Sequence, residues 1–213
     1  MRRIGLLIPK TNLTVEYELQ ILFSKGYFNI EKSVFYVSKL DYKTSYKEDK
    51  SKFLKDLATD ISNKQKDLEY LGVDYSAFFC TTSALENRVE VVNPTTSLIE
   101  EAKIRNVKNC LLITPYNDNL GNEVAKMLEE NEIKVIKNIN LNLLHTADYF
   151  NYGVNKLENL IEENYIKDYE NIIISCTNLP TIGIIEKLEY KLNTQIISSN
   201  SSLFTKIKRD NNI

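Results

Sequence analysis

The sequence contains few of the residues on which common catalytic centres depend. It has one histidine, His145, which argues against zinc sites that need two or more imidazoles and leaves a Ser-His-Asp triad only this residue as its base. It has 6 glycines in 213 residues, and none are spaced as in a dinucleotide fingerprint or a Walker phosphate loop. We therefore expect chemistry that uses neither a metal nor an organic cofactor.

Charge and hydrophobic runs exclude two further classes of partner. There are 27 Lys and Arg against 29 Asp and Glu, a net charge of −2 with no basic block, which argues against nucleic acid. No apolar run approaches membrane-spanning length, and the run at 4–9 is too short for a signal peptide. Three cysteines do not make a disulfide framework. These features predict a cytoplasmic protein with no membrane partner.

Short apolar runs alternate with amphipathic stretches along the whole chain. In 49–71 and in 181–192, apolar residues recur at helical spacing, and Gly72 is placed to end the first of these helices. Near-continuous apolar runs are typical of strands that are covered on both faces. The alternation predicts an α/β protein with mostly parallel sheets, whose strands are expected at 4–9, 34–40, 75–80, 110–115, 134–141, 171–176 and 195–198.

A weak internal repeat predicts two pseudo-symmetric lobes. Each half has a proline-containing loop after its first strand and Cys-Thr after its third, at Cys80 and at Cys176. We expect residues 1–93 with 196–213 to form the first lobe and 94–195 the second, with a hinge at 92–95 and Thr95 or Thr96 capping the next helix. Because ligands bind at the carboxyl ends of parallel strands, Cys80 and Cys176 are expected on opposite walls of one cleft.

Two thiols that face one carbon could perform proton transfer without a cofactor. Backbone N–H groups at a following helix start would stabilise the thiolate and lower the thiol pKa from about 8.5 toward neutrality. One sulfur could attack a substrate or remove a proton while the other delivers a proton, as a racemase or isomerase requires. The same loops offer groups for a substrate carboxylate, namely Thr11, Asn12, Thr81, Thr82, Thr177 and Asn178.

A cysteine that closes an apolar strand is also a common small core residue. This structural interpretation is favoured for Cys110, which opens an apolar run. The matched positions of Cys80 and Cys176 favour chemistry for these two residues, although a structural role for each remains the alternative.

Five segments, in order along the chain, resemble the maleate cis-trans isomerase and arylmalonate decarboxylase group of the aspartate/glutamate racemase superfamily. The likeness is strongest at 175–179, which resembles the loop of the second catalytic cysteine in that group. The five segments are 5–16 (GLLIPKTNLTVE), 79–83 (FCTTS), 112–116 (LITPY), 175–179 (SCTNL) and 196–200 (IISSN).

The resemblance implies a two-lobed fold with the active site between the lobes, a small carboxylate or dicarboxylate substrate, and a homo-oligomer. It implies that Cys80 attacks the double bond of a dicarboxylate, and that Cys176 is its acid/base partner once the C–C bond has rotated. Asn12 and Tyr116 would hold a substrate carboxylate. The alternatives are that Asn12 caps the following helix and that Tyr116 ends a strand with its hydroxyl in water.

The loop at 143–153 departs from the isomerases, because Tyr149 occupies a position where they commonly carry a carboxylate-binding asparagine. This difference favours a bulkier or less acidic substrate. His145 could be an auxiliary acid, although a lone loop histidine is more often solvated. Two alternatives to a racemase or isomerase stay open: a decarboxylase of the same group, which needs only one of the cysteines, and a carboxylate-binding module without activity.

Overall fold

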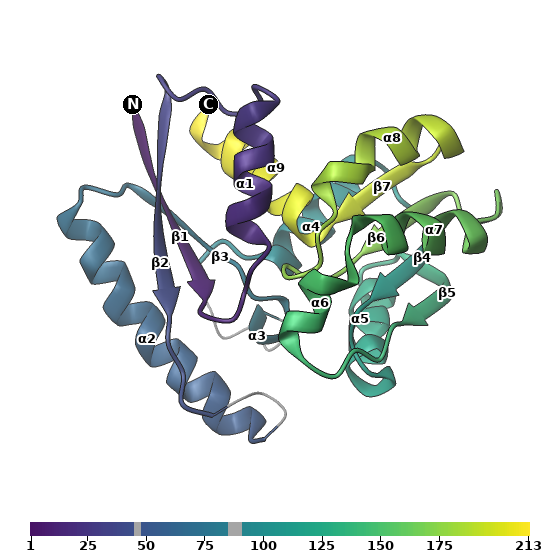
Figure 1. Cartoon of the computed structure of the whole chain (residues 1–213), viewed down its shortest axis with the longest axis horizontal. Coiled ribbons are helices and arrows are strands. Elements are labelled where there is room, and N and C mark those ends of the chain that lie inside the picture. The colour runs from purple at the N-terminus through teal and green to yellow at the C-terminus, as the bar shows by residue number, and fades with distance from the viewer. Residues whose placement is uncertain (45–47, 85–90) are drawn as a thin grey trace.

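The protein was analysed as a computed structural model, which describes residues 1–44, 48–84 and 91–213. The strands in these residues form two parallel sheets, which lie side by side in Figure 1. The first sheet has the order β2 (Ser33–Leu40), β1 (Arg2–Pro9), β3 (Tyr75–Phe78); the second has the order β5 (Lys134–Asn140), β4 (Asn109–Thr114), β6 (Asn171–Ile174), β7 (Gln195–Ser198). All seven expected strands are present, and the predicted fold class is confirmed.

Helices connect the strands and cover both sheets. The expected helices at 49–71 and 181–192 are α2 and α8, and Gly72, with a φ of 67°, follows the end of α2 as predicted. The helices are α1 (Val15–Ser24), α2 (Lys50–Tyr70), α3 (Thr81–Ala84), α4 (Pro94–Ile104), α5 (Asp118–Glu130), α6 (Thr146–Tyr152), α7 (Val154–Asn164), α8 (Ile182–Leu192) and α9 (Ser199–Asn211).

The sheet topology repeats in the two halves. In the first sheet β1 lies between β2 and β3, and in the second β4 lies in the same way between β5 and β6. Strand β7 extends the second sheet beyond β6, pairing Asn171 with Gln195 through Ile174 with Ser198. The expected boundary at residue 196 would assign most of this strand to the first lobe, whereas its hydrogen bonds place it in the second sheet.

The core of the first lobe shows why the apolar run along β1 is continuous. Ile4, Leu6 and Ile8 pack with α1 and α9 on one face, and Leu7 packs with α2 on the other. Successive side chains of a strand point to opposite faces, so a sheet that is covered on both faces needs a continuous apolar run. Helix α9 thus belongs to the first core, although it follows a strand of the second sheet (Figure 1).

The junction between the halves differs from the expected hinge. Val92 forms a parallel bridge with Ala77, and its carbonyl accepts a hydrogen bond from the Phe78 N–H at 2.8 Å. The N-cap of α4 is Asn93, whose Oδ1 accepts from the Thr96 N–H at 3.1 Å, so neither Thr95 nor Thr96 is the cap. Asparagine is a strongly preferred N-cap residue, and proline, here Pro94, is favoured at the first helical position directly after the cap.

Across the described ranges, no helix combines the length and the apolar character that crossing a bilayer would require.

The cap assignment predicts unequal effects of two neighbouring substitutions. Asn93→Ala should lower the free energy of unfolding by about 1 kcal/mol, because the start of α4 loses its acceptor. Thr95→Val should change it by less than about 0.5 kcal/mol, since the buried Thr95 hydroxyl has no partner among the described residues. Urea denaturation of the two variants measures both values. A larger loss in the Thr95 variant would contradict the assignment.

Candidate active site

The two cysteines occupy equivalent positions after strands of different sheets. Cys80 lies two residues after β3 and Cys176 two residues after β6. Both are buried, with 8% and 5% of their surface exposed, and neither takes part in a disulfide. Burial raises the pKa of Cys176, and the nearby Cys80 adds to that rise. The fold thus brings one thiol from each half into one region.

Thr177 connects the two cysteine loops directly. Its hydroxyl donates to the carbonyl of Phe79, the residue before Cys80, at 3.1 Å. The same hydroxyl accepts from Asn12 Nδ2 at 3.2 Å. Because the hydroxyl proton is already used, Thr177 serves the site by fixing Cys176 against β3 and the loop after β1.

Asn178 is a second bridge between the halves. Its Oδ1 accepts from the Leu13 N–H at 2.7 Å and from the Thr14 hydroxyl at 3.3 Å. Its Nδ2 donates to the carbonyl of Thr146 at 2.7 Å and to that of Thr11 at 3.4 Å. All four hydrogen-bonding positions of the amide are therefore occupied within the protein, which leaves this side chain no group for a carboxylate.

Asn12 combines contacts with the start of α1 and contact with the second half. Its Oδ1 accepts from the N–H groups of Thr14 and Val15 at 2.9 and 3.0 Å, but the N-cap of α1 is Thr14, so the alternative in which Asn12 is the cap residue is wrong. Its Nδ2 donates one hydrogen bond, to Thr177, and an amide nitrogen carries two hydrogens. The second hydrogen is the one that could bind a substrate oxygen.

Tyr116 lies beside Cys176 in the interior. It is 3% exposed, so the alternative in which its hydroxyl lies in water is wrong. Burial raises its pKa well above the usual value, and a hydrogen bond joins its hydroxyl to the Cys176 thiol. Tyr149 packs edge-on against its ring, with the ring centroids 6.1 Å apart. The departure noted in the loop at 143–153 therefore lies next to the second cysteine.

The pKa of Cys176 differs from the expectation of a neutral-pH thiolate. Burial raises it to about 11. The hydrogen bond from Tyr116 and the N–H groups of Asn178 and Leu179 lower it, but they offset only part of the desolvation. The sequence spacing correctly predicted the N–H groups beside Cys176. It could not predict how deeply Cys176 is buried, because burial depends on tertiary packing. At neutral pH Cys176 is a thiol, and so a proton donor.

The three remaining candidate residues lie around Cys80. Thr82 Oγ1 is 3.4 Å from the Cys80 sulfur. Thr81 is 3% exposed, and its buried hydroxyl has no hydrogen-bond partner within the described residues. Thr11 shares a 2.7 Å hydrogen bond with the hydroxyl of Tyr42.

Sequence reasoning missed Tyr42, whose pKa is raised mainly by the partial burial of its ring and further by the nearby Cys80. Tyr42 follows the carboxyl end of β2, which is the same edge of the sheet as Pro9 and Cys80. The rule that located the cysteines would have identified it if applied to every strand.

Two structural alternatives raised by the sequence are confirmed. Cys110 is 0% exposed in the second core, and burial raises its pKa to about 12. His145 is exposed at the start of α6, where its backbone N–H donates to the Asp148 carboxylate at 3.0 Å.

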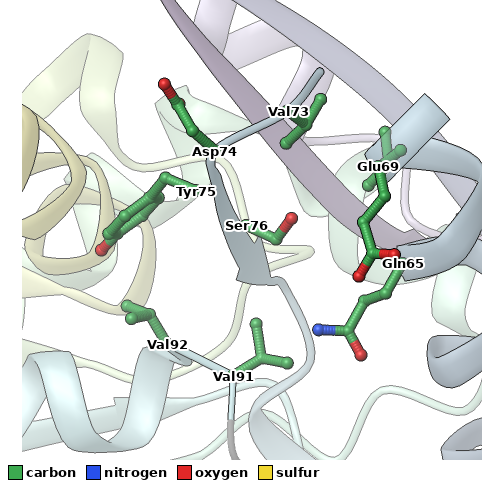
Figure 2. A pocket seen from close by; sticks show the side chains of 9 residues that line it. Gln65, Glu69, Val73, Asp74, Tyr75, Ser76, Val91 and Val92 are labelled. Carbon is green, nitrogen blue, oxygen red and sulfur yellow. The ribbon is translucent and has the colours of Figure 1, made fainter. Parts of the chain in front are cut away.

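A surface hollow of about 360 Å³ lies elsewhere, between α2 and the edge of β3. Figure 2 shows Gln65 and Glu69 of α2 on one side of β3 and Tyr75 on the other. None of the nine candidate site residues lines this hollow, and neither cysteine borders it. The convergence of thiols, hydroxyls and amides defines the candidate site instead.

Comparison with known proteins identifies the family of this two-thiol arrangement. Residues 70–210, which include both cysteines, match the family model described as arylmalonate decarboxylase. The chain belongs to the arylmalonate decarboxylase family. A curated relative, the maleate isomerase of Geobacillus stearothermophilus, is 22% identical over 99% of this chain and 92% of its own length.

Solved structures of members of this group share the fold. Maleate isomerase Iso from Pseudomonas putida S16 superposes with a TM-score of 0.86 at 16% identity, covering 100% of this chain and 93% of that one. A cysteine-to-serine mutant of the Nocardia farcinica maleate cis-trans isomerase, which holds a covalently bound succinylcysteine intermediate, gives 0.82 at 15% identity, with 98% and 91% covered. Arylmalonate decarboxylase gives 0.70 at 16% identity, covering 97% and 91%.

The surroundings of Cys176 predict its reactivity toward alkylation. Iodoacetamide should label Cys176 slowly at pH 7, with a rate that rises toward a midpoint near pH 11, because the buried thiol resists ionisation. Tyr116→Phe should move the midpoint to higher pH, since the hydroxyl that lowers the pKa is lost. Peptide mass spectrometry across a pH series measures each cysteine separately, with Cys110 as the buried comparison. A Cys176 midpoint below pH 8 would contradict this assignment.

Proposed function

We propose that the protein is a cofactor-independent cis-trans isomerase of a small unsaturated dicarboxylate, with Cys80 as the nucleophile and Cys176 as the acid/base partner. The observation that carries this proposal is the 3.1 Å hydrogen bond from the hydroxyl of Thr177, next to Cys176, to the carbonyl of Phe79, next to Cys80, because it joins the loops of two buried thiols from different halves. The relatives named maleate isomerase support the reaction class.

The proposed reaction needs no reagent other than the Cys80 and Cys176 sulfur groups. The Cys80 thiolate adds to one alkene carbon, forming a C–S bond, and the π electrons move onto the adjacent carbon and its carboxylate. Cys176 donates its proton to that carbon, which gives a succinyl thioether with a single C–C bond. The single bond rotates, the Cys176 thiolate removes the proton again, and the C–S bond breaks to release the trans isomer. No electron acceptor is consumed, and both thiols return to their initial state.

The surroundings of each thiol support this division of roles. Cys176 is protonated at neutral pH because of its burial, so it begins the cycle as an acid. After it has given up its proton, the Tyr116 hydroxyl and the N–H groups of Asn178 and Leu179 stabilise the thiolate.

Polar groups near the thiols are suited to bind the substrate. The buried hydroxyl of Thr81 lacks a protein partner in the described chain, and Asn12 retains one amide hydrogen. We assign a substrate carboxylate to these two groups, with Thr82 and Tyr42 beside Cys80. Tyr149 closes the side next to Tyr116 with an aromatic ring, which favours a substrate with a less polar end than maleate has.

A decarboxylase of the same family is the competing function. A decarboxylase needs one proton-donating thiol, so a second buried thiol at the equivalent position would have no part in that reaction. The pairing of Cys80 with Cys176 therefore favours chemistry on both sides of the substrate.

Substitution of each cysteine tests the roles. Cys80→Ser and Cys176→Ser should each lower turnover of a cis-dicarboxylate by several orders of magnitude, because each removes an essential group. Cys176→Ser should accumulate a succinyl thioether on Cys80, because water can supply the proton that completes addition, whereas serine is too weak a base to remove it again. Proton NMR of maleate and its methyl-substituted analogue measures turnover, and intact-protein mass spectrometry measures the adduct.

Cys110→Ala provides the matched control, because this thiol lies near the start of β4, at the opposite end of that strand from Tyr116, and the variant should keep its turnover. Wild-type rates in both serine variants would overturn the mechanism. Release of carbon dioxide from an arylmalonate, with no change in either cis-dicarboxylate, would assign the decarboxylase function instead.

A further inference from the structure

One fully buried carboxylate lies outside the set of residues that the reaction uses. Glu18 of α1 is 0% exposed, and its Oε1 accepts hydrogen bonds from the Thr181 N–H, from the Ile182 N–H at 2.7 Å and from the Thr181 hydroxyl at 3.2 Å. A buried carboxylate is tolerated only when it is well hydrogen-bonded. Here the donors come from the start of α8, so Glu18 ties the first half to the second.

The second carboxylate oxygen leads to the cysteine loop. Asn200 Nδ2 donates to Glu18 Oε2 at 2.5 Å and to the carbonyl of Thr177 at 3.0 Å. Thr177 is the residue after Cys176, and its hydroxyl holds the Phe79 carbonyl beside Cys80. Two hydrogen bonds therefore connect Glu18 with the peptide group between Thr177 and Asn178.

The orientation of the Asn200 amide depends on the charge of Glu18. Asn200 is 0% exposed, and its Oδ1 has no hydrogen-bond partner within the described residues. If the amide were reversed, Oδ1 would face two other acceptors, the Glu18 carboxylate and the Thr177 carbonyl. A protonated acid or a glutamine at position 18 would instead donate to Oδ1, and the reversed amide would withdraw its N–H groups from Thr177.

We propose that Glu18 is a positioning residue for the two-thiol reaction: its ionised carboxylate orients Asn200, and Asn200 holds the Thr177 carbonyl so that Cys176 stays placed against Cys80. This inference rests on the proposed function, since it concerns the same pair of thiols. Glu18 acts through Asn200 and Thr177 and touches neither sulfur.

The ionisation of Glu18 gives the proposal a distinctive pH dependence. Burial raises its pKa to about 7, and the hydrogen bonds from Thr181, Ile182 and Asn200 lower it only in part. All the groups that donate to it from α8 and α9 are neutral. The neighbouring charges on α1 and α8 are engaged at the surface, where Glu16 pairs with Lys39 and Lys25 pairs with Glu186.

Activity and stability should respond to Glu18 in opposite directions. Its pKa in the folded protein lies above the ordinary value, so its contribution to stability is fully present below about pH 4.5 and is lost as the pH rises through about 7. Positioning requires the ionised form, so kcat should fall as the pH drops below about 7. A purely structural role would make kcat follow stability.

The experiment compares Glu18→Gln and Asn200→Ala with Glu186→Gln. The control removes an exposed carboxylate that also joins α1 to α8, through a 3.1 Å ion pair with Lys25. Glu18→Gln and Asn200→Ala should each lower kcat by at least about tenfold, because small displacements of reacting groups cost up to about 100-fold, while KM changes by less than about twofold. Glu186→Gln should retain the wild-type kcat.

Two further readouts separate positioning from folding. The double variant should lose no more kcat than Glu18→Gln alone, because both changes break one connection. The decline of kcat below pH 7 should be absent from Glu18→Gln. Unchanged kcat in the folded variants, or losses that multiply in the double variant, would overturn the proposal. If Glu18→Gln fails to fold, Asn200→Ala decides, since it leaves the contacts of Glu18 with α8 in place.

Failure of the proposed function would be recognised separately. In that case the wild-type protein turns over no dicarboxylate, and the placement of Cys176 is measured by its iodoacetamide labelling rate at pH 9. Positioning predicts a several-fold change in that rate in Glu18→Gln and none in Glu186→Gln. Equal rates in the two variants would overturn the role of Glu18 whatever the reaction is.

Discussion

The placement of the Cys176–Asn178 loop against the first sheet is the constraint on which the candidate site depends. The two thiols come from separate sheets, so no strand pairing fixes one relative to the other. Thr177 and Asn178 supply that connection through buried hydrogen bonds to Phe79, Asn12 and the chain around Leu13. In a dry interior such bonds are costly to leave unmade, and this gives the loop one arrangement. The main role of the polar side chains in this loop is thus to fix its position against the first sheet.

This constraint also explains why some expected ligand groups have other roles. Asn178 has no hydrogen-bonding capacity left for a substrate, and Asn12 has one amide hydrogen. The groups that remain for recognition are fewer and lie nearer to Cys80, with Thr81 the clearest of them. Around Cys176 the environment is aromatic, from Tyr116 and Tyr149, and it sets the protonation state of the thiol. The two thiols thus have different surroundings despite equivalent places in the fold.

Much of the fold could be predicted from the sequence, because apolar runs and the helical spacing of apolar residues indicate directly which side chains are buried. The seven strands, helices α2 and α8, and the family followed from such patterns and from a few loop motifs. The N-cap of α4 and the sheet that β7 joins did not follow from these patterns, because several neighbouring residues or strands could have taken each place. The pKa of Cys176 could not be predicted either, because it depends on how far the effect of burial exceeds that of the local hydrogen-bond donors.

The position of Glu18 in the sequence is that of an ordinary helical acid, although it shares the buried face of α1 with Val15, Leu19 and Leu22. The lobe boundaries, the roles of the site residues and the expected homo-oligomer remain predictions.

The path of the C-terminal helix has a consequence for how the chain is assembled during synthesis. The first hydrophobic core needs Leu203, Phe204 and Ile207 of α9 to cover β1, whereas the second sheet is complete once β7 has formed. A nascent chain emerging from the ribosome therefore leaves one flank of β1 uncovered until residues 203–207 have been made. The first hydrophobic core is completed only after all four strands of the second sheet have left the ribosome.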